Sequence, residues 1–169
     1  MIELCPRLSR AQPRPFWSSN RAVKTRIAKG LLKNIALESI NAWDTIMGLQ
    51  FENLVHANLD LLLVRIGFDK KRVVNAGPYL QKQKLRREGC LIDVLLRTRR
   101  SRYVFEIKFR KRIARSIVDE VREKVRRLKL PRGQSVRTGL IYCGERDPEI
   151  DGRDDFDFLV SAEKLLTQK

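Results

Sequence analysis

The chain has 169 residues, of which 43% are hydrophobic, so it is long enough for one domain with a real core, and wholesale disorder is excluded. Lys and Arg number 36 against 20 Asp and Glu, and the formal net charge of +16 indicates a polyanionic partner, with nucleic acid ahead of an acidic membrane surface. The three cysteines are scattered and form no CxxC pair, which argues against a metal knuckle or a disulfide framework and favours a reducing compartment, the cytoplasm. The longest aliphatic run, residues 61–64, is far too short to span a membrane.

Residues 1–42 are predicted to form a basic arm that precedes the folded domain of residues 43–169. Residues 1 to about 20 are rich in proline and arginine and predict an extended chain, whereas the apolar spacing over residues 21–41 predicts a helical extension. The composition is also that of an organelle transit peptide, but its prolines interrupt the helix that such a peptide needs. We therefore favour a basic arm or the stub of a preceding domain, with organelle targeting left open.

The remaining elements alternate between helical and strand periodicity. The pattern predicts a long helix over residues 43–66 that ends at Gly67, and a second helix over residues 112–129 that Pro131 and Gly133 stop. Period-two patterns predict strands over residues 72–80, 90–97, 103–109, 138–143 and 156–160, with a short helix over residues 161–166. The order helix, strand, strand, strand, helix, strand predicts an α/β fold.

The hairpin of residues 90–109 carries three charged residues in an apolar setting. Strict alternation places Glu106 and Lys108 on one face of their strand, and Asp93 opposite the face of Ile92, Val94 and Leu96. A buried carboxylate needs a partner, which is either Lys108 in a structural ion pair or a divalent cation. Asp93, Glu106, the backbone carbonyl of Ile107 and several waters would suit Mg²⁺, which prefers oxygen ligands.

These residues carry a family resemblance. The segments Ile92-Asp93-Val94 and Phe105-Glu106-Ile107-Lys108 resemble the PD-(D/E)XK nuclease superfamily, over about residues 44–166. Ile92 stands where the superfamily motif has proline. The resemblance is greatest to the nuclease-like C-terminal domains of AAA-type ATPases and to archaeal-type junction resolvases, although this chain has no Walker A sequence. It implies a restriction-endonuclease-like αβββαβ core with a central mixed sheet flanked by helices. It also implies a homodimer and an ATPase partner.

A further acid is expected at the site. Many members of the superfamily have a Gly-x-x-x-Glu or Phe-Glu pattern in the first core helix, and this chain has Gly48 and Phe51-Glu52. Glu52 is expected at the edge of the apolar stripe, pointing toward the sheet, where it would hold a second metal ion or position water. The alternative is a boundary glutamate that covers the rim of the core. His56, one turn later, is assigned to packing or to the surface rather than to the site.

The function that follows is a Mg²⁺- or Mn²⁺-dependent nuclease acting on DNA, with RNA left open, of structure-selective or weakly sequence-specific type. Asp93, Glu106, Glu52 and Lys108 would be catalytic, and Lys108 would orient the attacking water or stabilise charge on the phosphate. Phosphate contacts are assigned to the following basic residues: Arg97, Arg99, Arg100, Arg102, Arg110, Lys111, Arg112, Arg115, Arg122 and Arg126.

Two alternative functions stay open at this point. In the first, the chain is a non-catalytic nucleic-acid-binding or regulatory module that keeps a nuclease fold, since fold does not settle function. In the second, it is a basic assembly module whose Glu-x-Lys triplet is a surface coincidence.

The role of the acidic loop of residues 145–157 also stays open. The loop is interpreted as a metal site, as a solvated turn, or as an intramolecular cover for the basic face.

Overall fold

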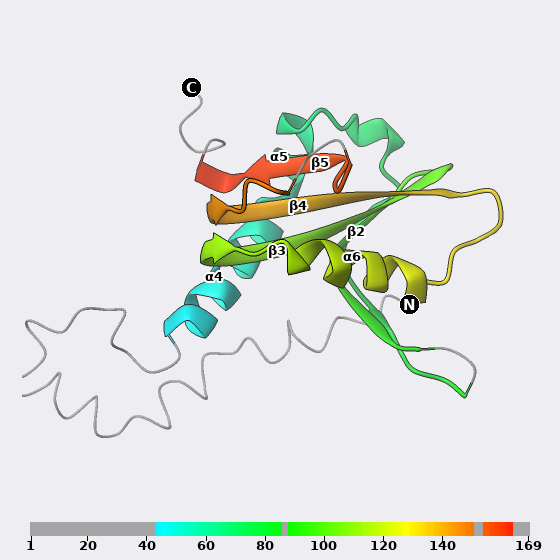
Figure 1. The fold of residues 1–169 in the computed structure, drawn as a ribbon. Helices are drawn as coiled ribbons and strands as arrows, with labels where there is room; N and C mark the ends of the chain where they lie inside the picture. The colour runs from blue at the N-terminus through cyan, green and yellow to red at the C-terminus, as the bar shows by residue number, and fades with distance from the viewer. Residues whose placement is uncertain (1–42, 86–87, 151–153, 164–169) are drawn as a thin grey trace, which may run out of the picture.

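A computed structural model describes residues 43–85, 88–150 and 154–163 (Figure 1). The predicted α/β class is confirmed, because a five-stranded mixed sheet is flanked by helices. The basic arm and the helix predicted over residues 21–41 lie outside the described residues, as does most of the helix predicted over residues 161–166.

The described elements follow the predicted order. They are α4 (Trp43–Ala57), α5 (Leu59–Arg65), a 3-10 turn η2 (Lys70–Arg72), β1 (Asn75–Gln81), β2 (Cys90–Arg97), β3 (Ser101–Ile113), α6 (Ser116–Arg127), β4 (Ser135–Arg146) and β5 (Phe158–Ser161). The sheet order is β1-β2-β3-β4-β5, in which β1, β2 and β3 are antiparallel neighbours and β3, β4 and β5 run parallel. Helix α6 is therefore the crossover between the parallel strands β3 and β4.

Two boundaries differ from the sequence prediction. The single helix expected over residues 43–66 is divided at Asn58, whose side-chain amide donates to the Leu54 carbonyl at 2.9 Å. Asparagine commonly competes with the helical backbone in this way. Helix α6 begins at Ser116 rather than at residue 112, because β3 continues to pair with β4 as far as Ile113. Gly67 ends the helical segment with φ +88°, as predicted.

Both faces of the sheet are covered, as parallel strands require. On one face, Val104 and Leu140 pack with Ile117 and Val121 of α6. On the other face, α4 and α5 pack against a second cluster that includes Phe51, Leu63, Phe105, Ile107 and Ile141. Figure 1 shows α6 in front of the sheet and α4 behind it.

The expected alternation of β2 is wrong at Ile92, and the reason is a β-bulge. Gly77 pairs with Leu95 and Tyr79 pairs with Ile92, so that Pro78 alone stands opposite both Asp93 and Val94. The extra residue on β2 reverses the facing of everything before it. Ile92 consequently packs in the α6 cluster with Leu95, while Val94 packs on the α4 side. The bulge places Asp93 where the two faces meet.

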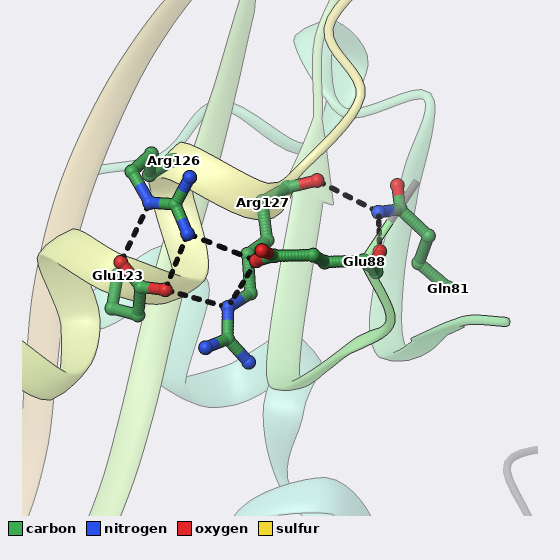
Figure 2. A network of polar contacts seen from close by, with 5 residues as sticks. All are labelled: Gln81, Glu88, Glu123, Arg126 and Arg127. Atoms are coloured by element: carbon green, nitrogen blue, oxygen red, sulfur yellow. Dashed lines mark hydrogen bonds and ion pairs between the residues drawn. The ribbon is translucent and has the colours of Figure 1, made fainter. Parts of the chain in front are cut away.

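The hairpin formed by β1 and β2 contacts α6 at the end beside its turn, where Gln81 pairs with Cys90. Gln81 is 5% exposed, and its side-chain amide donates to the carbonyl of Glu88 at 2.8 Å and to that of Arg127 at 2.7 Å. Its side-chain oxygen accepts from the Lys129 amide at 3.0 Å. Figure 2 shows the two contacts that the Gln81 amide donates, beside the pairing of Arg126 and Arg127 with Glu88. The nitrogen–oxygen distance is 2.9 Å in both of these ion pairs. The Gln81 side chain thus supplies hydrogen-bond partners to backbone groups of the hairpin and to backbone groups at the end of α6.

Replacing Gln81 with alanine is expected to lower the free energy of unfolding by about 1–3 kcal/mol, because three backbone groups lose the hydrogen-bond partner that this buried side chain supplies. Exposed Gln83, two residues along the same hairpin, is the matched control, and its alanine variant should stay within about 0.5 kcal/mol of the wild type. Urea denaturation measures both. Equal stability of the two variants would show that Gln81 does not hold the hairpin.

Candidate active site

An open pocket of about 350 Å³ lies where α4, β2, β3 and α6 meet. It is lined by Asp44, Thr45, Gly48, Leu49 and Glu52 of α4, Asp93 of β2, residues 106–110 of β3, and Glu120 and Lys124 of α6. All four residues that sequence analysis assigned to catalysis therefore line one pocket. Most of the lining is polar or charged, which suits a charged ligand better than an apolar one.

Asp93 sits where β2 and β3 separate. The pairing of these strands ends at Val94 and Phe105, and beyond that point the Asp93 carboxylate takes over as acceptor for the Ile107 amide, at 3.0 Å. The N–H and C=O of one residue in a strand point to the same neighbour, so the Ile107 carbonyl also faces the Asp93 side. The bulge thus directs the side chain of Asp93 into the gap between β2 and β3, and this residue is only 6% exposed.

Glu106 is more deeply buried, at 2% exposure, on the face of β3 that α6 covers. Two lysines hold it: Lys108 Nζ lies 3.0 Å from one carboxylate oxygen, and Lys124 Nζ pairs with the other. Glu120 of α6 joins the group, with its Oε1 3.1 Å from Lys108 and 3.6 Å from Lys124. The pocket floor is therefore a network of alternating charges.

Burial dominates the electrostatics of this network. Desolvation, reinforced by the Asp93 carboxylate, raises the pKa of Glu106 to about 7 against the opposing effect of the two lysines. Burial would lower the pKa of Lys108, but its contact with Glu106 outweighs this, and the pKa is raised. Lys108 is thus held in its charged form, whereas Glu106 takes up a proton readily. Acids that repel each other inside a pocket are typical of functional sites.

The pocket offers oxygen atoms of the kind that a hard cation takes as ligands. Asp93, Glu106 and the Ile107 carbonyl offer oxygen donors, and Mg²⁺ commonly takes only one or two carboxylates while keeping several waters. Glu52 lines the same pocket. Over the described ranges, however, no three His, Cys, Asp or Glu side chains are gathered closely enough to hold a metal ion by themselves. Waters or a substrate phosphate would have to complete the coordination.

Two residues of the network, Glu120 and Lys124, were not expected from the sequence. Lys124 follows Val121 by three residues and precedes Leu128 by four, so it occupies a position on the apolar stripe of α6 that would ordinarily be hydrophobic. A lysine at such a position indicates that its charge pairs with an acid inside the fold, as it does here with Glu106. His56 is near enough to Asp93 for the carboxylate to raise its pKa, but burial prevails and lowers it.

The basic residues assigned to phosphate contacts separate into distinct groups. Arg110 lines the pocket, and Lys111 follows it on β3, whereas the arginines of the β2–β3 turn lie at the opposite end of β3. Acids of the loop after β4 engage three others: Asp147 lies 3.4 Å from Arg112, and Asp155 lies 3.4 Å from Arg115 and 3.3 Å from Arg122. The acidic loop thus covers part of the basic face, which is one of the three roles considered for it.

No family model matches this chain, and neither does a curated protein or a solved structure. Among the residues that the structure describes, no helix is both long and apolar enough to cross a membrane.

Proposed function

We propose that the protein is a metal-dependent nuclease that hydrolyses phosphodiester bonds in DNA. The observation that carries this proposal is the convergence of Asp93, Glu106 and Lys108 in one charged pocket, although Asp93 comes from a different strand. Carboxylates beside a lysine in a solvent-accessible pocket are a suitable arrangement for phosphoryl chemistry. The strongly basic composition agrees with a polyanionic substrate.

The arrangement of elements supports a restriction-endonuclease-like core. A helix precedes three antiparallel strands, α6 then crosses over, and β4 returns parallel to β3, which is the αβββαβ order of that fold. The acid pair lies on the second and third of these strands, and Glu52 lies on the first helix. Fold alone leaves function open, so the weight of the proposal rests on the pocket.

In the proposed reaction Asp93, Glu106 and the Ile107 carbonyl would hold Mg²⁺ or Mn²⁺, and Glu52, which lines the same pocket, would contact a second ion or its water. The bound cation supplies Lewis acidity toward the phosphate and a lowered pKa for water. Lys108 is kept charged by Glu106 and Glu120, so it is ready to stabilise negative charge on the phosphate oxygens or to orient the attacking water. Arg110 at the pocket rim positions the phosphate backbone.

One observation favours a second candidate, a non-catalytic nucleic-acid-binding or regulatory module that works with a partner such as an AAA-type ATPase. Glu106 is already compensated by Lys108 and Lys124, so the fold needs no cation to neutralise it. In that case the charge network is structural, and the two lysines take the place of a metal ion.

A lysine variant distinguishes these candidates. Replacing Lys124 with alanine removes one countercharge of Glu106 and should cost about 1–3 kcal/mol of stability, less than a fully buried pair, because Lys124 is 19% exposed. If the site binds metal, Mn²⁺ should raise the melting temperature of this variant more than that of the wild type, since binding stabilises the folded state. Lys111→Ala, at an exposed position, is the control. Equal Mn²⁺ shifts in Lys124→Ala and Glu106→Gln would support the structural network.

The proposed function is tested by incubating the protein with plain duplex, single-stranded and branched DNA in Mg²⁺, Mn²⁺ or EDTA. Cleavage in either metal that EDTA stops would establish the nuclease, and the three substrates would report its preference for DNA shape. Salt-sensitive binding to DNA without cleavage in any metal would favour the regulatory module instead. An RNA duplex of the same sequence tests whether the sugar matters.

A further inference from the structure

The hairpin turn between β2 and β3 carries two arginines that face each other. Arg97 and Arg102 are direct partners in the antiparallel register, so their side chains leave the same face of the sheet with Cβ atoms about 5 Å apart. Like charges in such a position destabilise a sheet. Arg102 is two residues before Val104, which packs in the α6 cluster, so both arginines lie on the α6 face of the sheet. The pair therefore costs stability that a bound anion would recover.

Hydrogen bonds hold this turn in one conformation. The Thr98 hydroxyl donates to the Ser101 carbonyl and accepts from the Ser101 amide, both at 3.0 Å, and the Thr98 amide donates to the same carbonyl at 2.9 Å. The Ser135 amide at the start of β4 donates to the Arg100 carbonyl at 3.1 Å, which fixes the turn to the next layer of the sheet order. Arg99 and Arg100 are both exposed, so they are presented to solvent from a fixed backbone.

A neutral side chain orients Arg102. Its Nε donates at 2.7 Å to Oε1 of Gln134, which lies in the segment between α6 and β4. This contact positions the guanidinium without neutralising its charge, and it leaves the two terminal amino groups for another acceptor. Burial lowers the pKa of Arg102, and the charge of Arg97 lowers it further. An acceptor with a negative charge would oppose both effects.

Acids of the protein already pair with several arginines elsewhere on the basic face. These are Arg112, Arg115, Arg122 and Arg126. By contrast, no carboxylate in the part of the chain that the structure describes pairs with the arginines of the turn, which are Arg97, Arg99, Arg100 and Arg102. The structure thus separates cations that the fold neutralises from cations that a ligand can neutralise.

We propose that the β2–β3 turn is a phosphate-binding site for nucleic acid, in which Arg97 and Arg102 together hold one backbone phosphate. Arg99 and Arg100 contact the phosphates on either side of it. Guanidinium groups match the geometry of phosphate and bind it through more than one hydrogen bond. Such contacts fix the position of a nucleic acid without reading its sequence.

Two observations define this site further. A lipid surface is the less suitable partner, because none of the exposed large hydrophobic side chains belongs to residues 97–102. The turn is at the opposite end of β3 from the residues that line the pocket. The inference therefore goes beyond the proposed function, since the turn can bind nucleic acid whether or not the pocket is catalytic.

The test uses the full chain in EDTA, so that binding is measured apart from cleavage. Fluorescence anisotropy gives the affinity for a labelled DNA duplex at several salt concentrations, and the slope of log affinity against log salt reports how many phosphates the protein neutralises. Arg97→Gln/Arg102→Gln removes the shared contact. Lys70→Gln/Lys71→Gln on η2 is the matched control, because it removes two exposed cations at another place. Phosphatidylserine vesicles form a separate arm.

The arginine variant should lower the slope by about 0.9, the value for one phosphate of a DNA duplex, and the control variant should leave the slope unchanged. A fall of about 1.8 would indicate two separate phosphates and would overturn the shared contact. An unchanged slope would overturn the site, and so would an equal fall in the control variant. A loss of vesicle binding while duplex binding persists would also overturn it.

Melting temperature gives a second readout that does not depend on DNA. Arg97→Gln removes one charge of a repelling pair, so it should raise the melting temperature at low salt by about 1–3 °C. A lower melting temperature would show that Arg97 supports the fold, and would overturn its assignment to a ligand. Cleavage in Mg²⁺ with an unchanged salt slope would leave the nuclease standing and the turn site refuted. A reduced slope without cleavage would support the turn site alone.

Discussion

Replacing Asp93 with asparagine is expected to reduce metal-dependent cleavage of DNA by about a thousandfold while leaving the fold and DNA binding nearly intact. The side-chain oxygen of asparagine still accepts from the Ile107 amide, so the hydrogen bond now made by Asp93 is kept. The negative charge that a divalent cation needs is lost. A loss of this size is typical when an electrostatic contact to the reacting centre is removed. Gel-based cleavage assays and Mn²⁺ titration calorimetry measure the two effects.

The alanine variant at the same position separates structure from chemistry. Asp93→Ala should lose cleavage as fully as Asp93→Asn, but it should also lose about 1–3 kcal/mol of stability, because the Ile107 amide is left without its acceptor. Asp60→Asn, at an exposed acid on α5, controls for the change in net charge. Cleavage that survives in Asp93→Asn at the wild-type rate would remove Asp93 from the catalytic site.

Glu106 is expected to make the metal-free protein less stable as the pH rises. Its pKa is raised to about 7, mainly by burial, from an ordinary value of 4.5. The folded state therefore binds this proton more tightly than the unfolded state. The resulting stabilisation is complete below about pH 4.5 and is lost as the pH rises through 7. The difference amounts to about 3 kcal/mol.

Chemical denaturation in EDTA between pH 4 and pH 8 tests this expectation, with Glu106→Gln as the comparison. The stability of the wild type relative to Glu106→Gln should fall over this interval, whereas exposed Glu149→Gln should follow the wild type throughout. Parallel curves for the wild type and Glu106→Gln would show that the two lysines keep Glu106 ionised. If Mn²⁺ binds at Glu106, it should release a proton near pH 6, which calorimetry in buffers of different ionisation enthalpy detects.

Much of the fold was predictable, because periodicity marks long elements well. Strand β2 has the bounds that the sequence indicated, and the order of the elements is confirmed. The ends of elements were less accurate. Periodicity ended the strand at residue 109 and began a helix at residue 112, but β3 continues past an irregularity at residues 110–111 because Arg112 and Ile113 pair with β4. Such long-range pairing leaves no local signal in the sequence.

The candidate site was predicted in its residues but not in its geometry. Alternation correctly placed Glu106 and Lys108 together on a buried face, since Val104 marks that face as core. It did not anticipate the bulge at Asp93, which depends on Pro78 in the neighbouring strand. It also overlooked Lys124, because the charges of a helix are ordinarily assigned to solvent. Only the packing of α6 on the sheet shows that this lysine meets Glu106.

The bulge at Asp93 also bears on how the hairpin finds its correct pairing during folding. A regular two-stranded ribbon can slide by one residue at small cost in backbone hydrogen bonds, but each slip exchanges its two faces. Here Pro78 cannot donate to the ladder, and β2 carries one residue more than β1. A slipped hairpin would put the proline opposite a residue that needs a donor, and would move Ile92 out of the α6 cluster. The bulge that positions Asp93 thus also fixes the register of β1 and β2. We therefore expect misaligned forms of the hairpin to be sparsely populated.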